Sequence, residues 1–312
     1  MNLLIKRLIF ITIFLLPFII LPGTFYSMIF AKSLFFEGVV LIIGTLWLID
    51  IIYNKNKYNI PKNIVFWIFA LYILILLISG LNSFVPSLSF WGSMDHGIGV
   101  IFMLCLLIFS IITSSVLKTL EDWYKLFTVF IVSGILFTIG SLLAQAGVVF
   151  FEGFNINALS GFLIGNSSWT GIYMTFVFFM SLALAFSSKV KSQKVIGIIG
   201  ILTSFFDPTL TGFIVHAEGA HFGFIGLAKT ASYSLIPSVG FFILYLFFRK
   251  IQNIKWRKIF IGICISLFAL GTVAFFTVGL SPARQFVVEK AGPNRLVFWE
   301  IAIEGFKEKP VL

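Results

Sequence analysis

The residues best suited to chemistry on an anionic substrate lie near the C-terminal end, in residues 293–310 (PNRLVFWEIAIEGFKEKP). Apolar residues recur there at helical spacing around Trp299, so the pattern predicts a short amphipathic helix. Pro293 suits its first position and Pro310 ends it. Arg295, near its start, is a guanidinium that can hold a phosphate or pyrophosphate. An arginine of an interfacial helix can equally reach lipid phosphates, so both interpretations stay open.

A second candidate group lies in residues 90–99 (FWGSMDHGIG). Asp95 and His96 together can bind a sugar hydroxyl or act as acid and base. Trp91 can anchor the segment at a membrane interface, and this simpler interpretation is favoured. Asn166 precedes another apolar run, where it is expected to cap a helix rather than to bind a glycan.

The third group is His216, Glu218 and His221, within residues 212–226 (GFIVHAEGAHFGFIG). A carboxylate between two imidazoles resembles a loose metal cluster, but the spacing fits no standard zinc motif. The same three groups can also supply an acid and a base. A polar loop between two membrane spans explains them most simply. No metal site is therefore predicted.

The composition places these groups in a membrane protein. Of the 312 residues 59% are hydrophobic and only 11% are charged, and the mean hydropathy is +1.07. A soluble domain needs a more highly charged surface. Apolar runs of about 18 residues or more recur, which favours membrane helices. The fold class is therefore predicted as all-α: a polytopic helical membrane protein with a single membrane domain over residues 1–312, in contact with membrane lipid and with no nucleic-acid partner.

Nine spans are predicted from the apolar runs, with proline kinks in the first and an interruption at Lys229 in the eighth. Residues 280–312 then begin a large loop that contains the amphipathic helix. We expect the chain to be C-terminally truncated, because it ends within that loop. The spans are residues 8–30, 34–53, 64–80, 98–117, 124–146, 169–187, 195–212, 222–248 and 259–279.

The cationic residues predict the orientation. Fifteen lysines and arginines flank one set of alternating span ends, whereas the opposite short loops hold only Lys32, with Lys229 if it lies there. Cytoplasmic loops carry such an excess, so the N-terminus is predicted to be cytoplasmic and residues 280–312 to lie on the outer face. The net charge of +10 is explained by this topology.

Several segments, in order along the chain, resemble the O-antigen ligase family, which includes O-antigen polymerases and protein oligosaccharyltransferases. The tail resembles the outer-loop motif of that family, in which an arginine, a tryptophan and a helix precede a proline. Two departures stand out: the chain has Glu218 where the family usually has an arginine, and His96 where some members have one. The matching segments are residues 89–99 (SFWGSMDHGIG), 141–147 (SLLAQAG), 164–174 (IGNSSWTGIYM), 201–226 (ILTSFFDPTLTGFIVHAEGAHFGFIG) and 294–312 (NRLVFWEIAIEGFKEKPVL).

The resemblance implies a metal-independent glycan transferase without cofactors, in a bacterial cytoplasmic membrane. It would move a glycan from an undecaprenyl-pyrophosphate-linked donor to a glycan, lipid or protein acceptor on the outer face. Arg295 would be the catalytic residue, stabilising the leaving pyrophosphate. A transporter or flippase, or a non-catalytic degenerate relative, remains an alternative. On this resemblance, in contrast to the simpler interpretations above, the residues that would bind substrate are Trp91, His96, Asn166, His216, Glu218, His221 and Trp299.

Overall fold

The computed structural model describes residues 1–22, 28–54, 63–93, 96–150 and 161–207, two short strands, and isolated positions beyond residue 237. The chain divides into two compact units, Met1–Ile236 and Pro237–Leu312. In the second unit every described residue is helical. These include residues 301, 304, 305 and 307, but most of the predicted amphipathic helix lies outside the described residues, so that helix remains a prediction.

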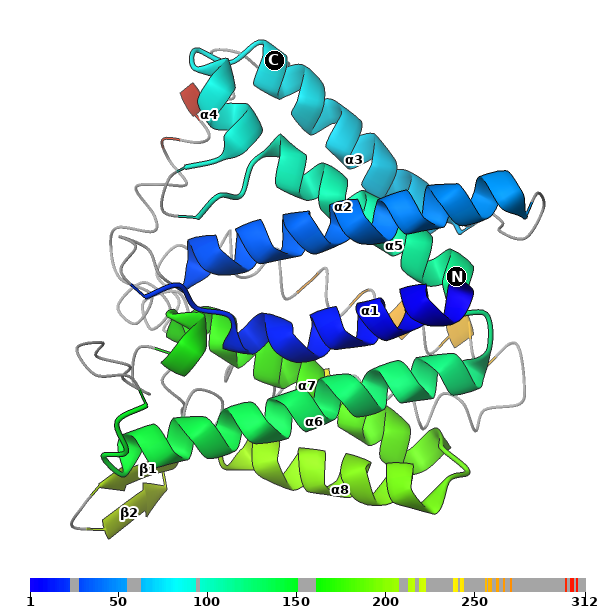
Figure 1. The fold of residues 1–312 in the computed structure, drawn as a ribbon. Coiled ribbons are helices and arrows are strands. Elements are labelled where there is room, and N and C mark those ends of the chain that lie inside the picture. The colour runs from blue at the N-terminus through cyan, green and yellow to red at the C-terminus, as the bar shows by residue number, and fades with distance from the viewer. Residues whose placement is uncertain are drawn as a thin grey trace. The chain divides into compact units, whose positions relative to one another are not determined.

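The first unit is a bundle in which successive long helices run in opposite directions (Figure 1). Each change of direction follows a polar or glycine-containing stretch between apolar runs. A two-stranded antiparallel hairpin follows the last helix of the bundle. In chain order the elements are α1 Asn2–Leu15, η1 Leu16–Phe18, α2 Ile29–Tyr53, α3 Ile64–Leu81, α4 Pro86–Trp91, α5 Val100–Val116, α6 Leu120–Gln145, η3 Phe162–Ile164, α7 Ser167–Ser187, α8 Lys191–Phe205, β1 Phe213–His216 and β2 Gly219–Phe222.

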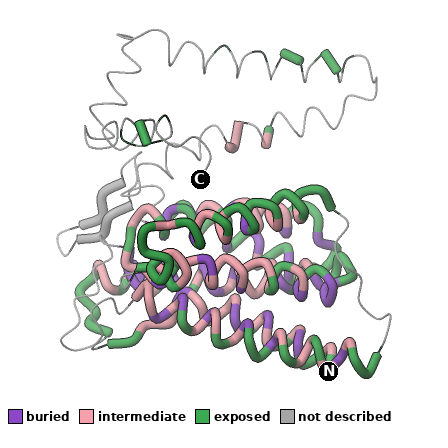
Figure 2. Tube along the Cα trace, turned by 90° about the horizontal axis from the view of Figure 1, so that it is seen from above, coloured by how far each residue is buried: buried purple, intermediate pink, exposed green. Residues whose placement is uncertain are grey.

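Four helices, α2, α3, α6 and α7, are long and apolar enough to cross a membrane, and α5 is a shorter apolar helix. Many large apolar residues are exposed, as surroundings of lipid favour. Figure 2 shows exposed residues along the helices of the bundle. The structure thus supports the helical membrane class predicted from the sequence. The number of nine spans remains a prediction, because most of the last two lies outside the described residues.

Several boundaries differ from those predicted. The first helix begins at Asn2 and ends at Leu15, with a 3-10 turn around Pro17, instead of continuing to residue 30. Proline lacks an N–H and clashes with the carbonyl four residues earlier, so it ends this helix rather than bending it. Likewise α8 ends at Phe205, just before Asp207 and a proline, and the β1–β2 hairpin then adds two strands to a fold predicted as all-α.

The bundle has two distinguishable ends. The end formed by the N-terminus, the α5–α6 turn and the α7–α8 turn carries most of the described lysines, and it is called here the cation-rich end (Figure 1). There Lys6 of α1 forms an ion pair with Asp122 of α6, with 2.7 Å between Nζ and Oδ2. Thr119 and Asp122 cap α6 reciprocally through side-chain and backbone hydrogen bonds. The opposite end, with the longer connections, is called the loop end.

Small residues bring the later helices close together. A Cβ added at Gly197 of α8 would lie 2.8 Å from the Ser181 carbonyl oxygen of α7, and one at Gly200 would strike the Ser181 side chain. Gly134 of α6 approaches Val177 of α7 in the same way. Such close backbone contact is how helices gain packing energy in lipid, where burial of apolar surface supplies little. These contacts fix α7, and with it the side chains at the loop end.

Candidate functional site at the loop end

The loop end is organised around Lys32 in the first turn of α2. Its ammonium donates hydrogen bonds to three backbone carbonyls: Ile19 at 2.6 Å, Leu163 at 2.7 Å and Met28 at 3.2 Å. Ile19 follows η1, and Leu163 belongs to η3 before α7. One side chain therefore joins the starts of α2 and α7 to the end of the first helix. The sequence predicts a short outward loop at this lysine, whereas in the structure it belongs to α2.

The turn that carries η3 depends on glycine. Gly161 and Gly165 flank η3 with φ values of 98° and 77°, in the left-handed region. A Cβ at Gly161 would also lie 2.5 Å from the Asn166 carbonyl carbon. Asn166 accepts hydrogen bonds from the backbone N–H groups of Ser168 and Trp169 through Oδ1, so it caps α7 as the sequence suggested. The tight turn and the cap together fix the position of Trp169 in the first turn of α7.

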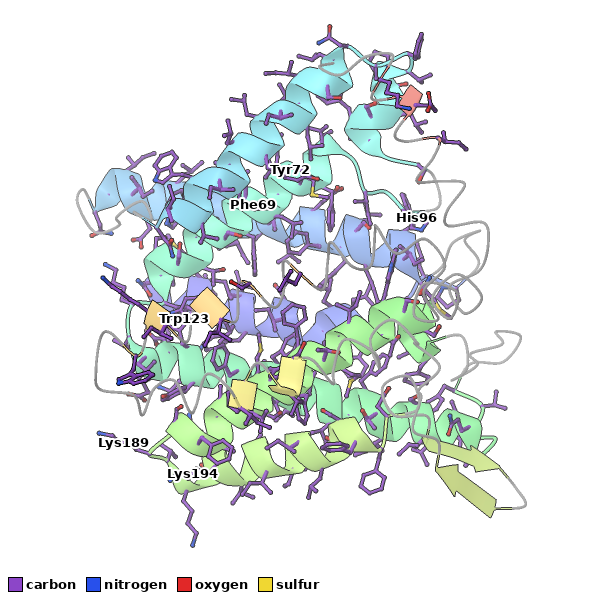
Figure 3. All side chains as sticks on the ribbon, turned by 180° about the vertical axis from the view of Figure 1, so that it is seen from behind. Phe69, Tyr72, His96, Trp123, Lys189 and Lys194 are labelled. Atoms are coloured by element: carbon purple, nitrogen blue, oxygen red, sulfur yellow. The ribbon has the colours of Figure 1, made fainter. Side chains whose placement is uncertain are left out.

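Two segments that the sequence analysis singled out meet at this end. The ring of His96, before α5, contacts the ring of Trp169, in the first turn of α7, with centroids 5.5 Å apart in an edge-to-face arrangement. Ser33 of α2 donates to the His96 carbonyl oxygen at 2.7 Å, which ties the His96 segment to the helix that carries Lys32. Figure 3 shows His96 at the opposite end of the bundle from Lys189 and Lys194.

The structure places the remaining predicted residues in other elements or does not describe them. Trp91 lies at the end of α4 with 69% of its surface exposed. His216 and His221 lie in the hairpin, where their backbones pair with Gly219 and Ile214. The remaining three, Glu218, Arg295 and Trp299, lie outside the described residues.

Sequence reasoning missed a buried carboxylate near the same end. Asp207 has no exposed surface, and Thr138 of α6 donates to its Oδ2 at 3.4 Å. Deeper in the bundle Tyr173 donates to Ser133, which in turn donates to the Phe14 carbonyl oxygen. An ionisable residue beside an apolar run was the available signal for Asp207. Nothing in the sequence linked Tyr173 to Ser133.

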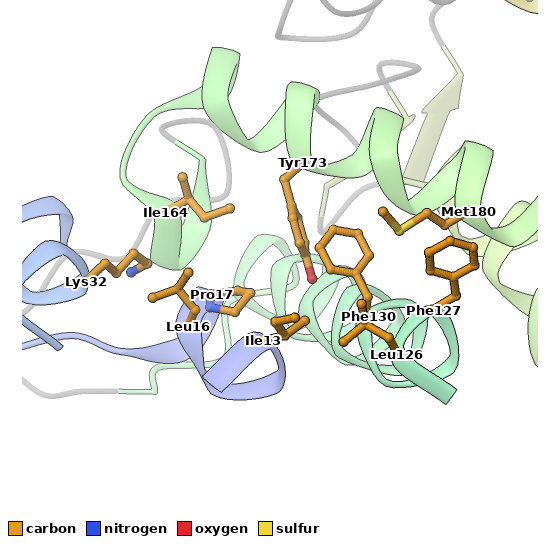
Figure 4. A pocket seen from close by; sticks show the side chains of 10 residues that line it. All are labelled: Ile13, Leu16, Pro17, Lys32, Leu126, Phe127, Phe130, Ile164, Tyr173 and Met180. Atoms are coloured by element: carbon orange, nitrogen blue, oxygen red, sulfur yellow. The ribbon is translucent and has the colours of Figure 1, made fainter. Parts of the chain in front are cut away.

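Two apolar hollows adjoin Lys32. The larger, of about 380 Å³, lies between α1, α6 and α7. The smaller, of about 180 Å³, lies between α2, α5 and the start of α7. Figure 4 shows Lys32 at one end of the larger hollow, with Phe127 and Met180 at the other and Tyr173 between them. The loop end thus combines apolar space, a cation and a histidine–tryptophan pair.

These groups can bind an anion, stack on a sugar ring and accept a proton. Within the described residues no group of three His, Cys, Asp or Glu side chains is placed to hold a metal ion. Comparison of the chain with protein-family models, with curated proteins and with solved structures found no match.

Proposed function

We propose that the protein transfers a glycan from an undecaprenyl-pyrophosphate-linked donor to an acceptor at the loop end of the bundle. The contact between His96 and Trp169 is the observation that carries this proposal. It joins two polar segments distant in sequence, each next to an apolar helix. An indole beside an imidazole suits a sugar, because the indole offers an apolar face to the ring and the imidazole can exchange a proton.

The proposed reaction forms one bond and breaks one. An acceptor hydroxyl attacks the anomeric carbon of the donor, its proton passes to a base such as His96, and the bond from that carbon to the phosphate oxygen breaks. The pyrophosphate leaves as an anion, whose charge Arg295 would stabilise. In this proposal the loop end faces outward and the cation-rich end faces the cytoplasm of a bacterial cell, as the distribution of lysines favours.

The test is glycan transfer by the full chain in lipid vesicles that contain the polyprenyl-pyrophosphate-linked glycan and an acceptor. We expect transfer by the wild type and a loss of about a hundredfold in rate for Arg295→Ala. His96→Ala and Trp169→Ala should each lower the rate by at least about tenfold. Two controls, Lys194→Ala at the cation-rich end and Trp67→Ala on the exposed face of α3, should leave it unchanged. Absence of transfer by the wild type contradicts the proposal.

A flippase for the same lipid is the second candidate, favoured by the polar groups inside the bundle. Asp207 is fully buried, and the Tyr173–Ser133 hydrogen bond lies between helices. Intramembrane polar groups of this kind often mark transport pathways. The same vesicles decide between the two functions: movement of intact donor between leaflets, without a glycosylated acceptor, would indicate transport.

A further inference from the structure

The two hollows beside Lys32 share part of their walls. Leu16, Lys32 and Ile164 line both of them. The larger hollow continues between α1 and α6, whereas the smaller one continues between α2 and α5. Two separate apolar spaces therefore diverge from one lysine.

The residues that line the larger hollow are spread along the bundle. It extends beside α7 from Lys32 and Ile164, near the start of that helix, to Met180 (Figure 4). At 1.5 Å per residue, the stretch from Ser167 to Met180 is about 20 Å long. A volume of about 380 Å³ spread over such a length has the form of an extended hydrocarbon chain rather than of a compact ligand. The smaller hollow, walled by Phe36 of α2 and residues of α5, has room for a shorter stretch of chain.

The charge at the junction favours an anion. Among the described residues that line the two hollows, Lys32 is the one lysine, arginine, aspartate or glutamate. Its hydrogen bonds go to three carbonyl oxygens, which are dipoles and carry no compensating negative charge. It also stands in the first turn of α2, where the helix dipole already favours negative charge. The longest of its bonds, at 3.2 Å to Met28, is the contact that a phosphate oxygen can replace most easily.

We propose that this junction binds one anionic diacyl phospholipid, with its phosphate at Lys32 and one acyl chain in each hollow. A lipid of this kind joins two apolar chains next to one phosphate, and it therefore matches both hollows and the cation at once. A single-chain lipid matches only one hollow. The site adjoins the proposed transfer site, because Trp169 also lines the smaller hollow, but it requires neither His96 nor Arg295.

The test measures lipid retained by the purified full chain, using native mass spectrometry after incubation with phosphatidylglycerol. One bound phosphatidylglycerol per chain is expected, with at least about tenfold weaker retention of uncharged diacylglycerol and of single-chain lysophosphatidylglycerol. Lys32→Arg should retain the lipid, because it keeps the charge. Equal retention of diacylglycerol, or of the single-chain lipid, would overturn the proposal.

Variants that fill one hollow at a time test the two-chain geometry without removing the lysine. Ile13→Phe narrows the larger hollow and Ile98→Phe the smaller one. Each should weaken retention of phosphatidylglycerol by about tenfold, while Ile172→Phe, at an exposed position of α7 outside both linings, should not. If only one of the two variants has an effect, a single chain occupies the site and the two-chain proposal is wrong. A thermal unfolding curve for each variant confirms that it is folded.

Discussion

Each end of the bundle holds a lysine between helices, and the two lysines are held differently. At the cation-rich end Lys6 contacts the carboxylate of Asp122, so the two charges compensate each other. At the loop end Lys32 contacts three backbone carbonyls. Lys6 thus pairs with a carboxylate between two helices. Lys32 instead bonds to carbonyl dipoles and adjoins apolar space. The same side chain is therefore structural at one end and suited to an anionic ligand at the other.

The difference follows from the connections. At the cation-rich end α5 and α6 are separated by residues 117–119, and α7 and α8 by residues 188–190. Short turns place helix ends beside each other, so caps and side chains supply the hydrogen bonds. At the loop end the connections are longer, as in residues 146–166 before α7. Irregular backbone there presents carbonyl groups that must find donors, and Lys32 supplies three.

Removal of the Lys32 ammonium should have the largest effect on stability. Lys32→Met keeps the side-chain volume but leaves three carbonyls without this donor, so we expect a loss of about 3 kcal/mol in the free energy of unfolding. Lys6→Met at the other end breaks a partly exposed ion pair and should cost about 1 kcal/mol. Denaturant unfolding in mixed micelles measures both. Equal losses would mean that the two lysines contribute equally to the free energy of unfolding.

The glycine turn at the loop end should be the next most sensitive. Gly161→Ala combines a left-handed φ of 98° with a Cβ 2.5 Å from the Asn166 backbone, and it should cost about 2 kcal/mol. Gly147 has a φ of 90° but nothing within 4 Å of an added Cβ, so Gly147→Ala should cost only about 1 kcal/mol. The same unfolding assay compares them. If Gly147→Ala is as damaging as Gly161→Ala, the backbone contact at Asn166 has no energetic role.

The contrast between the ends also shows what the sequence could predict. The third predicted span, residues 64–80, corresponds closely to α3 Ile64–Leu81, because a continuous apolar run with asparagine at both ends defines a helix locally. The cap at Asn166 was predicted for the same reason. The Thr119 capping box was equally local, yet it was missed within a predicted loop. Local patterns therefore account for most of the helices and for the cap at Asn166.

The loop-end site could not be predicted in this way. Lys32 was assigned to a loop because the first span was expected to continue through Pro17, which instead ends the helix. The contact of His96 with Trp169 joins residues that no periodicity relates, since it depends on how the segment before α5 and the start of α7 come together in the fold. Asp207 became notable only once its burial was known. Contacts between distant segments require the tertiary arrangement.

The capping box at the cation-rich end should contribute a moderate, purely local stabilisation. Thr119→Ala removes the hydroxyl that accepts from the Asp122 N–H at 3.1 Å, and it should lower stability by about 1 kcal/mol. Thr128 lies inside α6 and donates to the Tyr124 carbonyl four residues earlier. Thr128→Ala should be nearly neutral, because alanine has the higher helix propensity. A larger loss of stability for Thr128→Ala than for Thr119→Ala would show that the cap is not what stabilises this end.

The smallest effect is expected for a hydrogen bond that lies in an exposed position at the cation-rich end. Tyr124 donates to the Ser187 carbonyl oxygen at 3.2 Å, where competing polar groups can replace it, so Tyr124→Phe should cost at most about 0.5 kcal/mol. Tyr173 donates to Ser133 over the same distance but inside the bundle, where nothing replaces the bond. Tyr173→Phe should therefore cost about 1 kcal/mol, since it also leaves Ser133 with one partner fewer. Because both substitutions remove one hydroxyl from a tyrosine, the difference between the two losses isolates the effect of burial. A loss for Tyr124→Phe as large as that for Tyr173→Phe would show that the cation-rich end is as shielded from its surroundings as the interior.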